Sequence, residues 1–482
     1  MEDRIARWET VIGLETHVEL ATERKLFCSC SAAFGAPANQ NCCPLCLGEP
    51  GVRPALNEKA VELAVRGALA LGCRVETVSV FDRKHYSSPD LPRGYQITQF
   101  YRPLARDGAV RITLENGQEH TVHIAQVHLE DDAGRLFHDW EHGDTRVDFN
   151  RSGVPLIEIV TRPDFRNGDE VVAYLEELKT ILQYLGVSDC KLQEGSLRCD
   201  VNLSVRPEGS TELGTRTEMK NLGSFRAVRR AIEYESRRQI ALLERGERVV
   251  QETRRWDEDR NESISMRSKE DARDYRYFPE PDLPPLVLSE EYLLDLRARQ
   301  PELPGEKRAR YSREYGLPDY DARMLTGQRA LAEFFERTVA LGAQPKQAAN
   351  WIMGQVLRQL SQRNIGAEHM SLSPEALVKI LALVEEGRIN RNTAVQVFDA
   401  VFDGGDPEQY VKANGLEQVS DAGLVERAVE RVIRENPGPV SDFWAGKEKS
   451  FGFLMGQAMR LLDGKADPKV VNITLKNKLI VE

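Results

Sequence analysis

The sequence predicts an α+β protein in which a sheet-containing body is followed by a helical region. Before about residue 280, runs of Val, Ile and Leu alternate with polar residues, as is typical of half-buried strands. A proline-rich segment, residues 277–285, cannot continue a helix or a central strand. Beyond it, apolar residues recur at helical spacing. We therefore expect a body containing an antiparallel sheet, an all-α middle region and a small α-helical tail.

Each part of the body follows from its local pattern. Alternation predicts strands over residues 11–20, 122–129, 156–161 and 197–205. Two helices are expected between them, at 58–71 and 225–245, because apolar and polar residues repeat there with helical period. Gly246 follows the second helix and is suited to end it, since glycine adopts the left-handed conformation of a helix C-terminus.

The helical region divides into two parts. Ser373 and Pro374 form an N-cap followed by proline at the first helical position, and Gly387 ends that helix. Residues 331–341 and 350–360 are also amphipathic. A turn-rich stretch at 403–407 then precedes several short helices. The predicted domains are residues 1–292, 293–406 and 407–482.

Composition places the chain among soluble globular proteins. Of its 482 residues, 41% are hydrophobic and 29% charged. There is no apolar run long enough to span a bilayer. The first residues are acidic where a targeting segment would be basic, so a cytoplasmic location is expected. The net charge of −11 gives no general support for nucleic-acid binding. Any RNA would need a local basic patch.

Five of the eight cysteines lie between residues 28 and 46, which in such a chain points to metal rather than to disulfides. Cys43 and Cys46 have the spacing of a zinc knuckle, and Cys28 with Cys30 would complete a tetrahedral four-thiolate site. Cys42 is then spare. Such a site has no open position, so it would be structural. A redox dithiol and unmetallated buried thiols are the alternatives.

Acidic residues define a second candidate site. Alternation places Glu15, His17 and Glu19 on one face of the first strand. A solvated strand face would explain these three alone. Glu158, however, lies within an apolar strand, where a carboxylate needs a partner or a metal. A third segment, at 128–134, adds packed acids.

Several acid-bearing strands with apolar backs suggest a sheet face that binds Mg²⁺, with nucleotide phosphates completing the ion's shell. Cations should balance those phosphates. The candidates are Arg198, Lys220, Arg254, Arg255 and Arg276. The chain contains no P-loop and no dinucleotide-binding fingerprint, so a nucleotide would be held in a less common way.

In this order, the segments resemble the GatB family, the tRNA-activating component of the bacterial Asp/Glu-tRNA amidotransferase. The matching motifs cover nearly the whole chain: ETVIGLETHVEL (9–20), FDRKHY (81–86), YQITQF (95–100), HLEDDAG (128–134), DFNRSGVPLIEIV (148–160), EGSLRCD (194–200), KNL (220–222), QETRR (251–255), DYRYFPEPD (274–282) and GFLMGQ (452–457). The resemblance implies a cradle domain similar in part to glutamine synthetase. A helical domain and a YqeY-like tail should follow.

The resemblance also implies a reaction and a site. ATP would phosphorylate the side-chain carboxyl of Glu-tRNA(Gln) or Asp-tRNA(Asn), and ammonia would then displace phosphate. Glu15, Glu130 and Glu158 would coordinate magnesium with His17 beside them, and Asp131 could replace Glu130. We add Arg198 and Lys220 as phosphate contacts, from the residues themselves rather than from the resemblance. The zinc would be supportive, because some members of the family lack the cysteines.

Partners follow from what the chain lacks. It has no glutaminase signature, so ammonia must come from outside the chain. The resemblance implies that a partner amidase (glutaminase) subunit supplies it, in a heterotrimer that a third, small subunit completes. The resemblance further implies that the tail contacts tRNA. Two other functions are considered. One is a stand-alone ATP-dependent amide ligase acting on a free amino acid, and the other is a non-catalytic zinc-bearing tRNA adaptor.

Overall fold

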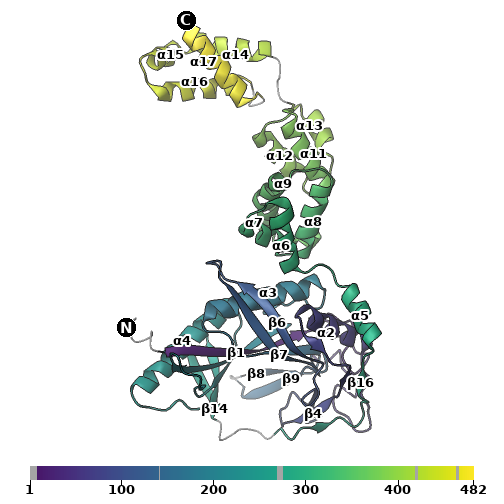
Figure 1. Ribbon diagram of the computed structural model, residues 1–482. Coiled ribbons are helices and arrows are strands. Elements are labelled where there is room, and N and C mark those ends of the chain that lie inside the picture. Colours follow the sequence, from purple (N-terminus) through teal and green to yellow (C-terminus); the bar gives the residue numbers. More distant parts are fainter. Residues whose placement is uncertain (1–7, 140–141, 269–274, 418–421, 463–465, 482) are drawn as a thin grey trace. The chain divides into compact units, whose positions relative to one another are not determined.

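The computed structural model describes residues 8–139, 142–268, 275–417, 422–462 and 466–481. The acidic N-terminal residues discussed above lie outside these ranges, as does Asp274 of the 274–282 motif. The chain forms two compact units, Met1–Leu303 and Pro304–Glu482 (Figure 1). Each has its own hydrophobic core. Both candidate sites belong to the first unit.

The first unit is built on a nine-stranded sheet with the order β14-β13-β12-β11-β1-β10-β7-β6-β2. Neighbouring strands run antiparallel, except for the parallel pair β12 and β13. The α+β prediction is thereby confirmed, and each of the four predicted strands is present. The strands are β1 (Trp8–Glu19), β2 (Arg74–Val75), β6 (Ala105–Thr113), β7 (Glu119–Asp131), β10 (Pro155–Thr161), β11 (Leu197–Pro207), β12 (Thr217–Lys220), β13 (Glu252–Asp257) and β14 (Glu262–Ser268).

Three helices cover one face of this sheet: α2 (Glu58–Ala70), α3 (Gly168–Tyr184) and α4 (Phe225–Glu244) (Figure 1). Gly67 of α2 packs against the side chain of Ile157 in β10. Because side chains alternate along a strand, Glu158 must point to the opposite face. The same rule applies to β1, where Leu14, Thr16 and Val18 are fully buried and the residues between them are only partly buried.

Short strands complete the first unit. β4 (Asp82–His85) pairs with β5 (Tyr95–Thr98) and with β15 (Phe278–Pro279), while β3 (Val78–Ser79) pairs with β16 (Leu286–Val287). A hairpin is formed by β8 (Arg135–Asp139) and β9 (Asp144–Asp148). The proline-rich segment contains no helix, but it is only partly extended, because a turn in which Leu283 N donates to Glu280 O at 3.4 Å interrupts it. Helix α5 (Glu290–Ala298) belongs to this unit, and just after it Gln300 Nε2 donates to Arg66 O at 2.7 Å.

Two helical features differ from the sequence-based expectation. Helix α3 was not predicted, although its N-cap is visible in the sequence: the Asn167 side chain accepts from Glu170 N at 2.9 Å. The helix expected at 350–360 is not a continuous α-helix. A π-helical turn, η2 (Ile352–Val356), separates α9 (Pro345–Trp351) from α10 (Leu357–Arg363). Gly354 lies at its centre, and glycine weakens the preference for regular α-helix.

The described residues of the second unit form helices joined by loops, with no strand, and they contain two separate apolar cores. One involves buried residues from Tyr311 to Val411, and the other residues from Val425 to Leu479. Around the first lie α6 (Pro304–Tyr315), α7 (Asp319–Thr326), α8 (Arg329–Ala340), η3 (Ala367–His369), α11 (Pro374–Glu385), α12 (Arg391–Val401) and α13 (Pro407–Ala413). Around the second lie α14 (Ala422–Glu435), α15 (Pro437–Trp444), α16 (Glu448–Leu461) and α17 (Pro468–Val481).

The predicted start and end of α11 are confirmed. The Ser373 side chain accepts from Ala376 N, and Gly387 has a positive φ of 70° just beyond the helix. Across the described ranges, no helix is both long and apolar enough to cross a bilayer.

Candidate active site and metal centres

The register of the sheet brings four ionisable residues into one row across the face opposite the helices. His128 of β7 is paired with Glu158 of β10, Glu158 with His17 of β1, and His17 with Arg198 of β11. Directly opposed side chains of neighbouring strands lie close together. Residues that are far apart in the sequence therefore meet because of antiparallel pairing alone.

His17, Glu130 and Glu158 form the first group with the geometry of a cation site. One potential ligand atom from each residue lies within 4.8 Å of the others. His17 Nε2 is 3.7 Å from Glu130 Oε1 and 3.9 Å from Glu158 Oε1. Glu130 is 2% exposed, and its Oε2 has no hydrogen-bond partner among the described residues. A buried carboxylate oxygen in this state is suited to bind a cation.

The protonation states of this group also fit a metal. Burial, and then the charge of Glu158, raise the pKa of Glu130 to about 8. Burial, followed by Arg198 and Lys220, lowers the pKa of His17 to about 3. The imidazole is therefore neutral at physiological pH, which is the form that coordinates metals. A divalent cation would relieve the repulsion between the two carboxylates.

The pKa of Glu130 predicts how cation binding depends on pH. A proton on Glu130 competes with the cation, so affinity for Mg²⁺ should rise with pH while the carboxyl is still protonated. We expect an increase of about fivefold from pH 7 to pH 8, with a plateau above about pH 9. Titrating Mn²⁺ into the full-length chain at each pH checks this. Glu130→Gln should show no such increase, and a flat profile for the unmodified chain would contradict the prediction.

Glu15 lies in a second group rather than with these three ligands. It is paired with Asp200 across β1 and β11, and one carboxylate oxygen each of Glu15, Asp200 and Glu218 of β12 lies within 4.8 Å of the others. Asn202 Nδ2 donates to Glu15 Oε1 at 2.9 Å. The prediction that Glu15 shares a magnesium site with Glu130 and Glu158 stays a prediction: Glu158 is near enough to help raise the pKa of Glu15, after burial, but the carboxylates within ligand range of Glu15 are Asp200 and Glu218, and the sequence did not single out Glu218. The alternation of Thr217, Glu218 and Met219 just before the KNL motif was the available signal.

Glu130 and Asp131 are the two alternative cation ligands predicted from the sequence, and they lie in different surroundings. Because neighbours on a strand point to opposite faces, only Glu130 joins the cation group. Asp131 accepts from Ile97 N at 2.9 Å and is ion-paired with Arg93. Its carboxylate is thus already occupied by structural contacts.

Three cations border the two acidic groups. Arg198 donates to Asp132 Oδ2 at 2.6 Å. Lys220 Nζ lies 2.5 Å from Asp200 Oδ2 and 2.9 Å from Glu218 Oε1. Lys84 was not identified from the sequence as a site residue. Burial lowers its pKa, but the nearby Glu130 and other acidic groups more than offset this, so its pKa is raised. All three are partly buried positive charges beside the acids.

The remaining basic candidates have other partners. Arg254 is bound to Ser263 and to Glu252, within a buried network that includes Glu235. Arg255 lies 3.7 Å from Asp257. Arg276 has a positive φ of 39°, and its carbonyl oxygen lies 3.2 Å from His85 Nδ1.

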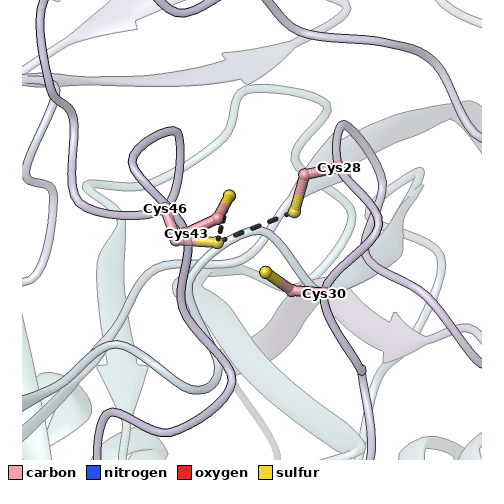
Figure 2. A group of neighbouring side chains, drawn as sticks. All are labelled: Cys28, Cys30, Cys43 and Cys46. Carbon is pink, nitrogen blue, oxygen red and sulfur yellow. Dashed lines mark hydrogen bonds between the residues drawn. The ribbon is translucent and has the colours of Figure 1, made fainter.

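Residues 28–46, here called the cysteine loop, form a separate site. Figure 2 shows the sulfurs of Cys28 and Cys30, on one loop, converging with those of Cys43 and Cys46, on another. Cys46 Sγ lies 3.7 Å from Cys28 Sγ and 3.8 Å from Cys43 Sγ. Tetrahedral zinc with bonds of about 2.3 Å requires sulfur separations of about 3.8 Å, so the four thiols fit zinc. Cys42 is outside this group, and its sulfur lies 3.9 Å from Asn150 Oδ1.

Comparison with known proteins gives the family. The GatB/GatE catalytic domain model matches residues 10–294, and the GatB domain model (GatB_Yqey) matches residues 333–479. The chain belongs to the GatB family. Relatives named as the B component of aspartyl/glutamyl-tRNA(Asn/Gln) amidotransferase share this sequence over almost its full length. The protein of Lachnoclostridium phytofermentans is 52% identical, over 98% of this chain and 99% of the relative.

Two further relatives carry the same name. The Caldicellulosiruptor saccharolyticus protein is 52% identical over 98% of this chain and 99% of its own length. The Thermodesulfovibrio yellowstonii protein is 50% identical over 97% and 98%, respectively. The resemblance inferred from the motifs is thereby confirmed. In this GatB-family chain, both acidic groups and the four cysteines lie within the match to the catalytic-domain model.

Proposed function

We propose that this chain is the tRNA-activating subunit of an Asp/Glu-tRNA amidotransferase. The observation that carries the proposal is the His17–Glu130–Glu158 group on the helix-free face of the sheet. Membership of the family and the printed names of the relatives support the same activity. The substrates are ATP and a mischarged tRNA, either Glu-tRNA(Gln) or Asp-tRNA(Asn).

The reaction has two steps. A side-chain carboxylate oxygen of the aminoacyl-tRNA attacks the terminal phosphorus of ATP, so a carbon-bound oxygen gains the phosphoryl group and ADP leaves. Ammonia then attacks the acyl carbon, the bond to the phosphate oxygen breaks, and the nitrogen loses a proton. The activation is necessary because a free carboxylate carries no group that ammonia can readily displace, whereas the acyl phosphate carries phosphate. Bound Mg²⁺ would neutralise the phosphates and hold them in line with the attacking oxygen.

The acidic residues of the site would hold the cations, and the basic residues beside them would contact the phosphates. Glu130, Glu158 and His17 would hold one cation. Glu15 would hold a second with Asp200 and Glu218, although the sequence alone suggested a single site. Arg198 and Lys220 would contact phosphate, and their present acidic partners keep them beside the two groups. Bound cations would balance both the excess of buried negative charge there and the negative charge of the phosphates.

Structural zinc is proposed for Cys28, Cys30, Cys43 and Cys46. The pKa of Cys46 is lowered to about 4, mainly because the Cys28 thiol donates a hydrogen bond to it. A thiolate at that position is ready to bind metal. Four protein ligands would leave no open position, so this metal would not take part in the reaction.

A partner is required for the nitrogen. We propose a cytoplasmic heterotrimer in which an amidase (glutaminase) subunit releases ammonia from glutamine and a third, small subunit completes the assembly. The decisive experiment is amidation of both mischarged tRNAs by the purified complex with ATP and glutamine. Conversion of either one supports the proposal. A stand-alone ligase would amidate free glutamate without the partners, and a tRNA adaptor would retain activity after loss of Glu130.

The domains proposed from the sequence give the tail, residues 407–482, a role in contacting tRNA. The separate apolar core of residues 425–479 supports treating the tail as a distinct body. Because Val411 packs in the preceding core, the deletion that tests this role is best made after Glu417. Loss of residues 418–482 should weaken tRNA binding about tenfold, by removing phosphate contacts, while ATP hydrolysis by the complex persists. Filter binding measures the first and phosphate release the second. Unchanged tRNA affinity would contradict this role.

A further inference from the structure

Lys25 is a buried cation at the base of the cysteine loop. Its side chain is fully buried. The ammonium nitrogen lies 3.4 Å from Cys46 Sγ and donates to Phe149 O at 3.2 Å. No ion pair between Lys25 and a carboxylate occurs in the part of the chain that the structure describes. A buried ammonium without a counter-charge is strongly disfavoured, and the Cys46 sulfur beside it can carry a negative charge as a thiolate.

The positive charge of Lys25 is opposite to the charge that the zinc-loaded four-cysteine site would carry. Four thiolates around one Zn²⁺ carry a net charge of about −2, which is costly in a buried setting unless a cation is nearby. Groups that contact metal ligands from outside also fix the orientation of those ligands. Lys25 is placed to do both for Cys46. A small cavity bordered by Lys25, Cys28 and Cys46 is also lined by Arg93 and Asp131.

Residues 149–153, here called the bridging loop, hold the cysteine loop from the other side. Asn150 Nδ2 donates to Pro37 O at 2.8 Å, and Asn41 N donates to Asn150 Oδ1 at 2.8 Å. Phe149 provides the carbonyl oxygen that accepts from Lys25. The bridging loop is therefore tied to the cysteine loop by backbone, amide and ammonium contacts.

The same bridging loop holds the end of the acidic strand. Gly153 N donates to Asp132 O, and Asp132 N donates to Val154 O, both at 2.9 Å. Asp132 directly follows β7, which ends with Glu130 and Asp131, while the bridging loop continues into β10, which carries Glu158. A shift of the bridging loop would thus move both carboxylates of the first cation group.

We propose that Lys25 is a positioning residue that links metal occupancy of the Cys28–Cys30–Cys43–Cys46 site to cation binding at Glu130 and Glu158, through the bridging loop. The inference rests on the proposed metal-binding roles of both groups. With zinc bound, the charged cluster holds the ammonium, and the ammonium holds the Phe149 carbonyl. Without zinc, this restraint on the bridging loop is released.

The test compares Lys25→Met with Lys59→Met in the full-length chain. Lys59 is an exposed lysine of α2 that pairs with Glu62 at 2.9 Å, so it is a matched control. Zinc affinity is measured by competition with a chelator, and Mn²⁺ binding by paramagnetic resonance, in zinc-loaded and zinc-stripped protein. Lys25→Met should lose zinc affinity by about 10- to 100-fold. Stripping zinc from the unmodified chain should weaken Mn²⁺ binding about tenfold.

The distinguishing result is that Mn²⁺ affinity no longer depends on zinc occupancy. In Lys25→Met, Mn²⁺ affinity should be weak with or without zinc, while Lys59→Met should behave like the unmodified chain. The proposal is overturned if zinc stripping changes Mn²⁺ affinity equally in Lys25→Met and the unmodified chain, or changes it in neither. If Lys25→Met does not fold by circular dichroism, Lys25→Gln, which keeps a hydrogen-bond donor but removes the charge, must show the same loss of coupling or the proposal fails. Unchanged Mn²⁺ binding by Glu130→Gln would instead refute the proposed cation site itself.

Discussion

Glu130→Gln is expected to reduce ATP-dependent amidation of mischarged tRNA by about 10³-fold, because it removes a charged ligand from the site of phosphoryl transfer. Glutamine preserves the size of the side chain, so packing around this 2%-exposed position should survive. The substitution also removes the carboxylate whose pKa burial raises to about 8. Metal-free protein should therefore be no less stable than the unmodified chain, since folding at neutral pH no longer requires this buried carboxyl to take up a proton.

Glu119→Gln provides the matched control. Glu119 begins the same strand, β7, but is exposed at its opposite end. Its replacement should leave amidation within about twofold of the unmodified complex, as expected of a surface change. The assay follows Gln-tRNA or Asn-tRNA formed by the complex, with circular dichroism confirming that both variants fold. If Glu130→Gln and Glu119→Gln were equally active, the His17–Glu130–Glu158 group would not be the reaction centre.

Cys43→Ser is expected to abolish stable zinc binding, whereas Cys42→Ser should retain it. The two cysteines are neighbours in sequence, but only the Cys43 sulfur lies with those of Cys28, Cys30 and Cys46. Loss of one thiolate should weaken zinc binding at least about 100-fold. The loop of residues 28–46 has little regular secondary structure, so without metal it should become sensitive to protease.

Zinc content is measured by atomic emission. We expect about one zinc ion per chain in the unmodified protein and in Cys42→Ser, and less than about 0.1 per chain in Cys43→Ser. Limited proteolysis gives an independent readout of the loop. Equal zinc content in both variants would show that the ligand set is different. A disulfide between Cys43 and Cys46 in freshly purified, zinc-free protein would favour the redox alternative instead.

The sequence predicted the body of the protein well where a pattern was local. The alternation of β1 put Glu15, His17 and Glu19 on one face, and the structure leaves these three partly buried while Leu14, Thr16 and Val18 are fully buried. Helix α3 was missed because its apolar residues lie between strand-like runs. The π-helical turn after Trp351 was missed because a local insertion leaves the amphipathic pattern almost unchanged.

The sequence alone determined the fold class, the family and the residue types of both sites, because period-two alternation, cysteine spacing and contiguous motifs are properties of nearby residues. Only the tertiary structure decided which acids meet. Strand pairing set His17 opposite Glu158 and Glu15 opposite Asp200, while alternation along β7 put Glu130, and not Asp131, in the group with His17 and Glu158. The tertiary structure also placed Lys25 against Cys46. Register and loop packing depend on contacts between distant segments, and no local pattern encodes them.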